Sequence, residues 1–137
     1  MSKLHQTAAT LRFFGEALDP DEITALLGKP PTRSCRKGDE RCLHGGGTAR
    51  EPRGSWIRTV RRLSPGDLDA QIDNLLSDLT QDIAAWQALS ERFQADLFCG
   101  LFLREGNEGL PVSPETLLAL GMRGLKLDLD IYGPEAD

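Results

Sequence analysis

The stretch that decides the fold is Ala95-Asp96-Leu97-Phe98-Cys99-Gly100-Leu101-Phe102-Leu103. In an extended chain its apolar side chains fall on two faces, with Leu97, Cys99, Leu101 and Leu103 on one and Phe98 and Phe102 on the other. A strand that is apolar on both faces belongs inside a sheet, with other elements packed above and below it. The stretch therefore predicts architecture and says nothing about activity.

A second strand follows close to the carboxyl end, at residues 125–132. Leu125, Leu127, Leu129 and Ile131 alternate there with Lys126, Asp128, Asp130 and Tyr132. This alternation predicts one buried face and one face that lies in water or meets a partner. We expect the two strands to lie side by side, covered by one long helix.

That long helix is predicted from Leu68 to Phe93, where apolar residues recur at three- and four-residue spacing. It would hold roughly 26 residues and extend about 39 Å. A shorter helix is expected after Asp19-Pro20, with Gly28 at its end. A third helix is expected after Ser113-Pro114, with Leu117, Leu118 and Leu120 on its inner side.

Three more strands are expected at residues 8–14, 32–36 and 55–61, so the element order is β-α-β-β-α-β-α-β. This order predicts an α+β fold: a mostly antiparallel sheet with helices packed on one face, similar to the ferredoxin-like order with an added unit. A chain of 137 residues has room for one domain, residues 1–137. Residues 37–53, which include Gly45-Gly46-Gly47, lack periodicity and are predicted to form a long, mobile, basic loop.

The composition is that of an ordinary globular protein, with 39% hydrophobic and 27% charged residues. No apolar run approaches the ~20 residues that a membrane-spanning helix needs, and no secretory signal core follows Lys3. An odd number of cysteines, three, argues against a disulfide framework and favours the cytoplasm. No motif indicates a cofactor.

Charge is distributed unevenly along the chain. The segment 29–62 holds ten basic and three acidic residues, a net charge of +7, so the rest of the chain carries −12 to give −5 overall. Such a segment could bind an anion or nucleic acid, with Trp56 stacking on bases. The alternative is that its cations pair with acids elsewhere in the same fold.

Three parts of the chain together resemble the bacterial family DUF4279, a domain of unknown function. They are Gly15–Thr24 leading into Pro31–Ser34 and Arg36–Asp39, then Asp96–Gly100, then Leu127–Tyr132. The resemblance covers nearly the whole chain and implies a small, stand-alone bacterial domain. It brings no catalytic residues, because the family has no established reaction.

One candidate metal site consists of Cys35, Cys42 and His44, which lie within ten residues of one another. Three ligands and a water would suit catalytic zinc, but the usual paired cysteine spacing is absent. The alternatives are exposed loop residues in a reducing compartment, or a Cys35–Cys42 disulfide across a hairpin.

Asp128 and Asp130 are the candidate residues for an enzyme. Two residues apart on a strand, they face the same way about 6.5–7 Å apart, which could place an acid beside a base or two ligands for a hard cation. The alternative is a solvated outer face.

The leading hypothesis is a non-enzymatic domain that acts by binding, either to a protein partner, as an inhibitor would, or to a second copy of itself. Phe98, Phe102 and Tyr132 lie on strand faces that the helices are not expected to cover, and uncovered apolar faces mark interfaces. Arg33, Arg36, Lys37 and Trp56 would form a rim that recognises anions. The hypothesis favours a protein or a homo-oligomer over nucleic acid as the partner and involves no membrane.

Overall fold

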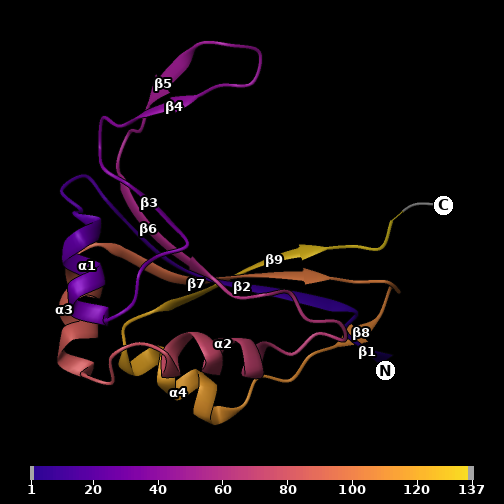
Figure 1. The fold of residues 1–137 in the computed structure, drawn as a ribbon. Helices are drawn as coiled ribbons and strands as arrows, with labels where there is room; N and C mark the ends of the chain where they lie inside the picture. Colours follow the sequence, from indigo (N-terminus) through magenta and orange to yellow (C-terminus); the bar gives the residue numbers. More distant parts are fainter. Residues whose placement is uncertain (1, 136–137) are drawn as a thin grey trace.

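A computed structural model describes residues 2–135, which are organised around a five-stranded sheet of order β3-β6-β2-β7-β9 (Figure 1). Three neighbouring pairs are antiparallel, and β7–β9 is parallel. The protein is therefore α+β with a mostly antiparallel sheet, as predicted. The strands are β1 (Ser2–Lys3), β2 (Gln6–Gly15), β3 (Arg33–Cys35), β4 (Glu40–Cys42), β5 (Thr48–Arg50), β6 (Gly54–Thr59), β7 (Gln94–Phe102), β8 (Glu108–Gly109) and β9 (Lys126–Tyr132), and the helices are α1 (Pro20–Leu27), α2 (Leu68–Ser77), α3 (Ile83–Arg92) and α4 (Pro114–Met122).

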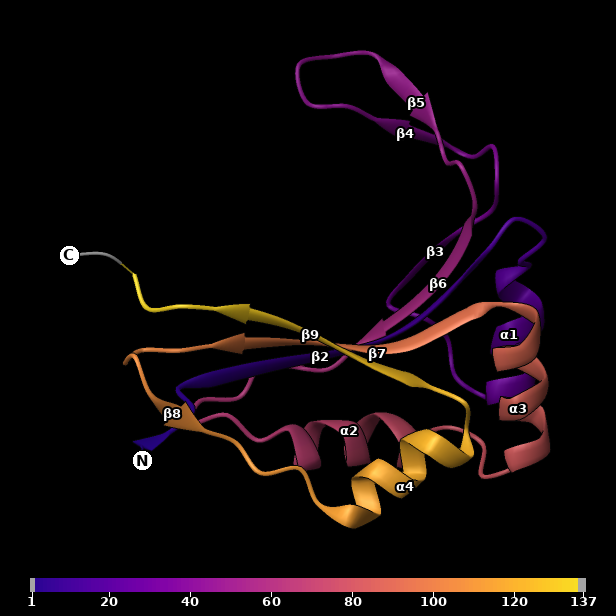
Figure 2. The ribbon, with the colours of Figure 1, turned by 180° about the vertical axis from the view of Figure 1, so that it is seen from behind.

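All four helices lie on one face of this sheet, which leaves the other face open (Figure 2). The reason is the alternation of the central strands, because Leu11, Phe13 and Leu97 are buried and their sequence neighbours point the other way. Each helix contributes buried apolar side chains to the same core, among them Ile23, Leu75, Trp86 and Leu120. None of the helices within residues 2–135 is long and apolar enough to cross a membrane.

The strand at residues 94–102 occupies the interior position that its sequence predicts. It pairs with β2 on one side, where Leu97 lies opposite Leu11, and with β9 on the other, where Leu97 lies opposite Leu127. The two apolar strands near the carboxyl end are therefore side by side, as predicted. Cys99 is fully buried in β7, and burial raises the pKa of its thiol to about 12.

The prediction of one long helix is wrong, because the segment forms α2 and α3 with a corner at residues 78–82. At this corner the backbone N–H of Thr80 donates to the Leu27 carbonyl at 2.9 Å, and the Trp86 indole N–H donates to the Thr80 carbonyl at 2.7 Å. The Asp82 side chain accepts from the N–H groups of Ala84 and Ala85 and so begins α3. The corner turns α3 towards α1, which packs against it at one end of the sheet.

Residues 37–53, predicted as a loop, contain the β-hairpin β4–β5, which projects from the sheet as an arm (Figure 1). We call Glu40–Arg50 the arm. Its strands are only three residues long and nearly all exposed, so they show no buried periodicity in sequence. Gly45, Gly46 and Gly47 all have positive φ, between 82° and 100°, which glycine adopts without strain and which allows the chain to reverse. The mobility of the arm stays a prediction.

Two expectations about burial are wrong at the β9 edge of the molecule. Leu117 and Leu118, expected inside, are 51% and 63% exposed, and α4 packs through Thr116 and Leu120 instead. Exposure rises from 6% at Leu125, just before β9, to 43% at Leu129 and 61% at Ile131 within it. The face of β9 predicted to be buried is therefore covered only at its beginning, because β9 is the last strand of the sheet and the helices do not extend under its end.

Candidate binding face

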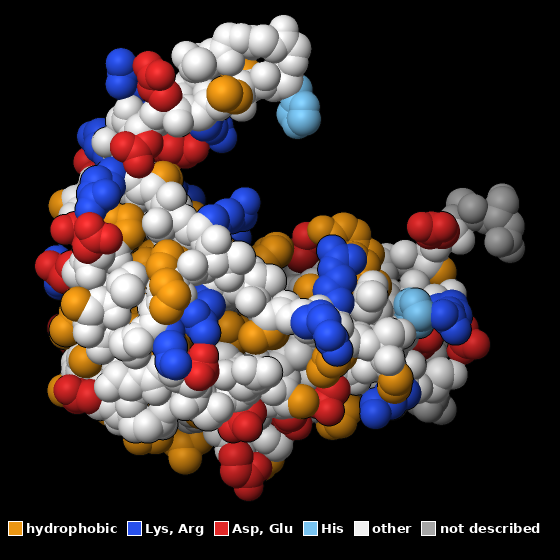
Figure 3. Space-filling model, in the orientation of Figure 1, with side chains coloured by type: hydrophobic (Ala, Val, Ile, Leu, Met, Phe, Trp, Pro, Cys, Tyr) orange, Lys and Arg blue, Asp and Glu red, His pale blue; other side chains and the backbone are white. Residues whose placement is uncertain are grey.

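The open face of the sheet, opposite the helices, is the candidate functional surface. It is formed by the side chains that alternate with the core residues along each strand, including Arg12 and Phe14 of β2 and Phe98 of β7. The arm rises from one end and curves above this face, so that the molecule encloses a wide hollow (Figure 3). Half-buried aromatic rings and arginine side chains share the floor of this hollow.

At the centre of the open face, Arg12 is held rigidly by its neighbours. Its Nε and Nη2 atoms donate to the two carboxylate oxygens of Asp96, each at 2.8 Å. Its guanidinium lies 4.1 Å from the centroid of the Phe98 ring, and Nη2 is 3.7 Å from Asp128 Oδ2. The hydrogen bonds to Asp96 raise the pKa of Arg12 above its ordinary value. This bidentate pair fixes both side chains in one geometry.

Beside it, beneath the root of the arm, three arginines line a cavity of about 390 Å³: Arg33, Arg41 and Arg53. We call this the arginine pocket. Arg53 is preorganised, because its guanidinium lies 4.2 Å from the Phe14 ring centroid and its Nη1 donates to Gln94 Oε1 at 2.9 Å. Within residues 2–135, neither Arg33 nor Arg53 has a carboxylate within ion-pair distance, whereas Arg41 lies 3.7 Å from Glu51.

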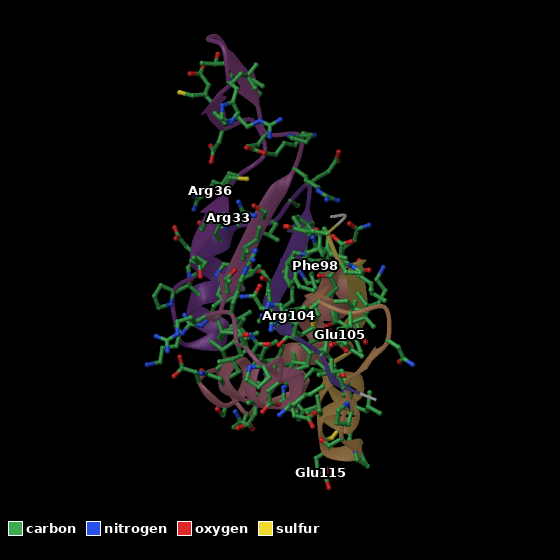
Figure 4. The ribbon with its side chains drawn as sticks, turned by 90° about the vertical axis from the view of Figure 1, so that its right-hand side faces the viewer. Arg33, Arg36, Phe98, Arg104, Glu105 and Glu115 are labelled. Atoms are coloured by element: carbon green, nitrogen blue, oxygen red, sulfur yellow. The ribbon has the colours of Figure 1, made fainter. Side chains whose placement is uncertain are left out.

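The predicted basic rim is only partly present. Arg33 lies at the β3 edge of the pocket, across the sheet from Phe98 (Figure 4). Arg36 instead donates to Asp19 and Asp21, each at 2.8 Å, and Lys37 lies 3.5 Å from Glu16. These two cations are therefore paired with acids around the start of α1, which is the alternative that the sequence left open.

Trp56 is not part of the rim, and that prediction is wrong. Its side chain is fully buried on the helical face, 6.0 Å from the Phe13 ring centroid, and its indole N–H donates to Thr24 Oγ1 at 3.0 Å. A residue in this position cannot stack on a ligand. Its strand neighbours Ser55 and Ile57 face the arginine pocket instead.

The predicted aromatic residues do lie on the open face, towards its β9 end. Phe102 and Tyr132 are stacked, with ring centroids 4.8 Å apart, and the Arg62 guanidinium lies 4.7 Å from the Phe102 centroid. These three side chains line a second hollow, of about 740 Å³. The Tyr132 hydroxyl donates to Asp130 at 2.5 Å, and this hydrogen bond raises the pKa of Tyr132.

Asp128 and Asp130 lie on the same face of β9, as predicted, but their neighbours differ. Asp128 lines a hollow of about 460 Å³ that also contains Arg12 and Lys126, whereas Asp130 is outside that hollow and accepts from Tyr132. The two carboxylates thus have different neighbours. Their use as an acid–base pair stays a prediction.

The three candidate metal ligands are also dispersed. Cys35 Sγ lies 3.2 Å from Ser55 Oγ at the β3 edge, Cys42 is exposed on the arm, and His44 is in the turn of the arm. All three cysteines are free thiols, so there is no Cys35–Cys42 disulfide. In the part of the chain that the structure describes, no three His, Cys, Asp or Glu residues are grouped as metal ligands would be.

Sequence reasoning missed Arg12, Asp96 and Phe14, and it included Arg41 and Arg53 only as members of the basic segment 29–62. For Asp96 a signal was present, because an acidic residue inside an otherwise apolar strand needs a partner when it is partly buried. Arg12 offered the matching signal in β2. Nothing in sequence indicates that the two strands place them opposite each other, which requires the β2–β7 register.

Comparison with known proteins identifies one family. The family described as a domain of unknown function, DUF4279, matches residues 5–134, nearly the whole chain. No curated protein and no solved structure matches the chain. The match covers every helix, the five strands of the central sheet and the arm.

Proposed function

This chain belongs to the DUF4279 family, and from that premise we propose that the domain is a binding module that captures an acidic segment of a protein partner on its open face. The acidic side chains enter the arginine pocket, and apolar side chains of the same segment lie on the aromatic floor. The domain performs no chemistry on this partner. Three free cysteines support placing it in the cytoplasm, and the family resemblance supports a bacterial source.

One observation carries the proposal: Arg33 and Arg53 line one pocket with no carboxylate at ion-pair distance among the described residues, in a chain whose net charge is −5. Several other cations of the chain are paired, as in Arg36 with Asp19 or Arg92 with Glu22. What distinguishes Arg33 and Arg53 is that both line the same pocket. Two unneutralised guanidinium groups at one site attract a carboxylate and match its two oxygens geometrically.

The surroundings of the pocket support a peptide more than a free ion. Phe14, Ile57 and Pro52 provide apolar surface next to the arginines, and Glu51 limits how much negative charge the pocket accepts. The arm rises beside the pocket and curves above the open face (Figure 3). An extended segment with alternating acidic and apolar side chains fits a surface of this kind.

The test uses a fluorescein-labelled peptide of alternating Glu and Leu, titrated with the protein at low salt and followed by fluorescence anisotropy. We expect saturable binding that weakens about tenfold or more in Arg33→Gln/Arg53→Gln, because each lost charge-assisted contact removes roughly 1.5 kcal/mol. The matched control is Arg61→Gln/Arg92→Gln, which removes the same charge away from the pocket and should bind like the wild type.

Two results would overturn the proposal. Equal weakening by the pocket variant and the control would show a general charge effect, with no defined site. Tighter binding of labelled poly-dT than of the peptide under the same conditions would assign the basic segment to nucleic acid. Circular dichroism melting of each variant ensures that loss of binding is not loss of folding.

A further inference from the structure

The outer edge of β9 has backbone groups that no described strand uses. The Tyr132 carbonyl accepts from the Leu103 N–H at 3.0 Å, so the even-numbered residues of β9 direct their hydrogen-bonding groups towards β7. Successive residues of a strand alternate in direction. Leu127, Leu129 and Ile131 therefore present their N–H and C=O groups at the free edge.

This edge has charged side chains but lacks three other features that protect edge strands: a bulge, a proline and a covering element. Its pairing with β7 runs from Lys126 to Tyr132 without a bulge, and it contains no proline. Proteins ordinarily blunt an exposed strand edge or cover it, because an open edge pairs with other chains. Seven residues of regular strand are enough to form a further ladder of hydrogen bonds.

Exposed apolar side chains are concentrated at the same side of the molecule. Of the eight large hydrophobic residues exposed within residues 2–135, six belong to β9 and α4. They are Leu117, Leu118, Met122, Leu129, Ile131 and Tyr132. Figure 4 shows α4 below this edge of the sheet, with Glu115 at its far end pointing away from the strands. Apolar surface clustered beside an open strand marks an interface.

We propose that β9 pairs antiparallel with β9 of a second copy of this chain, which joins the two five-stranded sheets into one of ten strands about a two-fold axis through Asp128. The α4 helices of the two copies then lie on the same side of the joined sheet, where Leu117 contacts the other copy, whereas Leu118 lines the groove between α2 and α4. This dimer uses the sheet edge and does not depend on the proposed function of the open face.

The charges of β9 select the second copy as the occupant and also select the register. In an antiparallel pair, residues directly opposite each other share a face. Centring the pair on Asp128 places Lys126 of each copy opposite Asp130 of the other and sets Leu127 opposite Leu129. Centring it on Leu129 would place Asp128 opposite Asp130 twice, and centring it on Asp130 would leave Lys126 without a partner. Centring it on Leu127 would also oppose Lys126 and Asp128, but it would pair only residues 126–128 of the strand.

The selected register has one unfavourable contact, Asp128 opposite Asp128. Arg12 reduces its cost, because its Nη2 lies 3.7 Å from Asp128 Oδ2 in each copy. Asp128 also directs its backbone groups towards β7, so the central pair lacks hydrogen bonds and its Cα atoms lie about 4.5 Å apart. Two cysteines at this position would satisfy disulfide geometry.

The first test is sedimentation equilibrium over a range of concentrations. The wild type should approach twice the 15.0 kDa mass of the chain. Lys126→Asp and Asp130→Lys each place like charges opposite each other twice, and each should weaken the dimer about tenfold or more. The double variant Lys126→Asp/Asp130→Lys restores opposite charges and should restore the dimer. A monomer at every concentration up to about 1 mM, or a dimer indifferent to the single changes, overturns the proposal.

The second test fixes the register and does not require strong association. Asp128→Cys in a Cys42→Ser background should form a disulfide-linked dimer under mild oxidation, because two cysteines then face each other across the axis. Tyr132→Cys in the same background is the matched control, because it faces Gly124 of the second copy and should remain unlinked. Linkage through the control alone, or equal linkage of both variants, overturns the register and with it the charge argument.

Discussion

The two faces of the five-stranded sheet are made by alternate residues of the same strands, yet they are held in entirely different ways. On the helical face Phe13, Trp56 and Leu97 are fully buried. The ring centroid of Phe13 lies 6.0 Å from that of Trp56 and 6.3 Å from that of Trp86. On the open face Arg12 and Asp96 hold each other by paired hydrogen bonds. The difference shows that burial stabilises one face, whereas charge pairing orders the other, which no helix covers.

The largest effect should come from truncating a side chain on the helical face. Trp86→Ala removes a fully buried ring and its hydrogen bond to the Thr80 carbonyl, so we expect a loss of about 3–5 kcal/mol in the free energy of unfolding. Phe98→Ala, on the open face, should lose less than about 1.5 kcal/mol, because its ring is only partly buried. Urea unfolding followed by circular dichroism measures both, and equal losses would contradict the division between the faces.

The second effect concerns the charge pair that orders the open face. Asp96→Asn leaves the Arg12 guanidinium without its carboxylate, and we expect a loss of about 2 kcal/mol in the free energy of unfolding. A double-mutant cycle with Arg12→Gln isolates the coupling between the two side chains, which should exceed about 1 kcal/mol. Strict additivity of the two single changes would show that the pair does not order this face.

Much of this division could be read from the sequence, because local patterns determine it. The start and end of α1 are determined by residues adjacent in sequence. Asp19 accepts from the Asp21 N–H, Pro20 is the first helical residue, and Gly28 ends the helix with φ of 96°. The position of β7 followed from its apolar faces alone. Phe98 and Phe102 were placed on the open face by the same alternation.

The failures occurred where a distant part of the chain decides the outcome. The break between α2 and α3 depends on Thr80 meeting the Leu27 carbonyl, a contact over more than fifty residues, while the apolar spacing continues through the corner unchanged. Trp56 alternates with Ile57, and either could have faced the core. Its burial follows from the register that sets it opposite Phe13. Arg36 and Lys37 do not line the arginine pocket, because they form ion pairs with acids around the start of α1.

A third, smaller effect concerns the hydrogen bonds that join α2 to α4 on the helical face. Asp69 Oδ1 accepts from the Ser113 N–H at 3.0 Å and from the Thr116 hydroxyl at 2.7 Å, which lowers the pKa of Asp69 and ties α2 to the start of α4. Asp69→Asn should lower the free energy of unfolding by about 1 kcal/mol at pH 7. The pKa of Asp69 is lower in the folded state than in the unfolded state, where it is about 3.9. The contact therefore contributes fully to stability above the unfolded-state pKa, and this contribution is lost as pH falls through the folded-state pKa.

Unfolding of the wild type and Asp69→Asn at a series of pH values measures that difference directly. The two curves should be separated at neutral pH and converge below about pH 4. Asp73→Asn is the control, because it lies on the same helix and its side chain has no described hydrogen bond. Its curve should follow that of the wild type at every pH. A constant separation down to about pH 2 would mean that the Asp69 carboxylate does not carry the contact.

The smallest effect on stability should come from removing the arm, which belongs to neither face. Replacing Glu40–Arg50 with a short Asn-Gly turn removes no residue of the buried core, and the ion pair of Arg50 with Glu40 lies within the arm itself. Exposed pairs of this kind stabilise little, so the free energy of unfolding should change by less than about 0.5 kcal/mol. Binding of the acidic peptide should nevertheless weaken, since Arg41 and the rest of the arm above the open face are lost. A large loss of stability would show instead that the arm supports the sheet, and its position above the open face would then be structural.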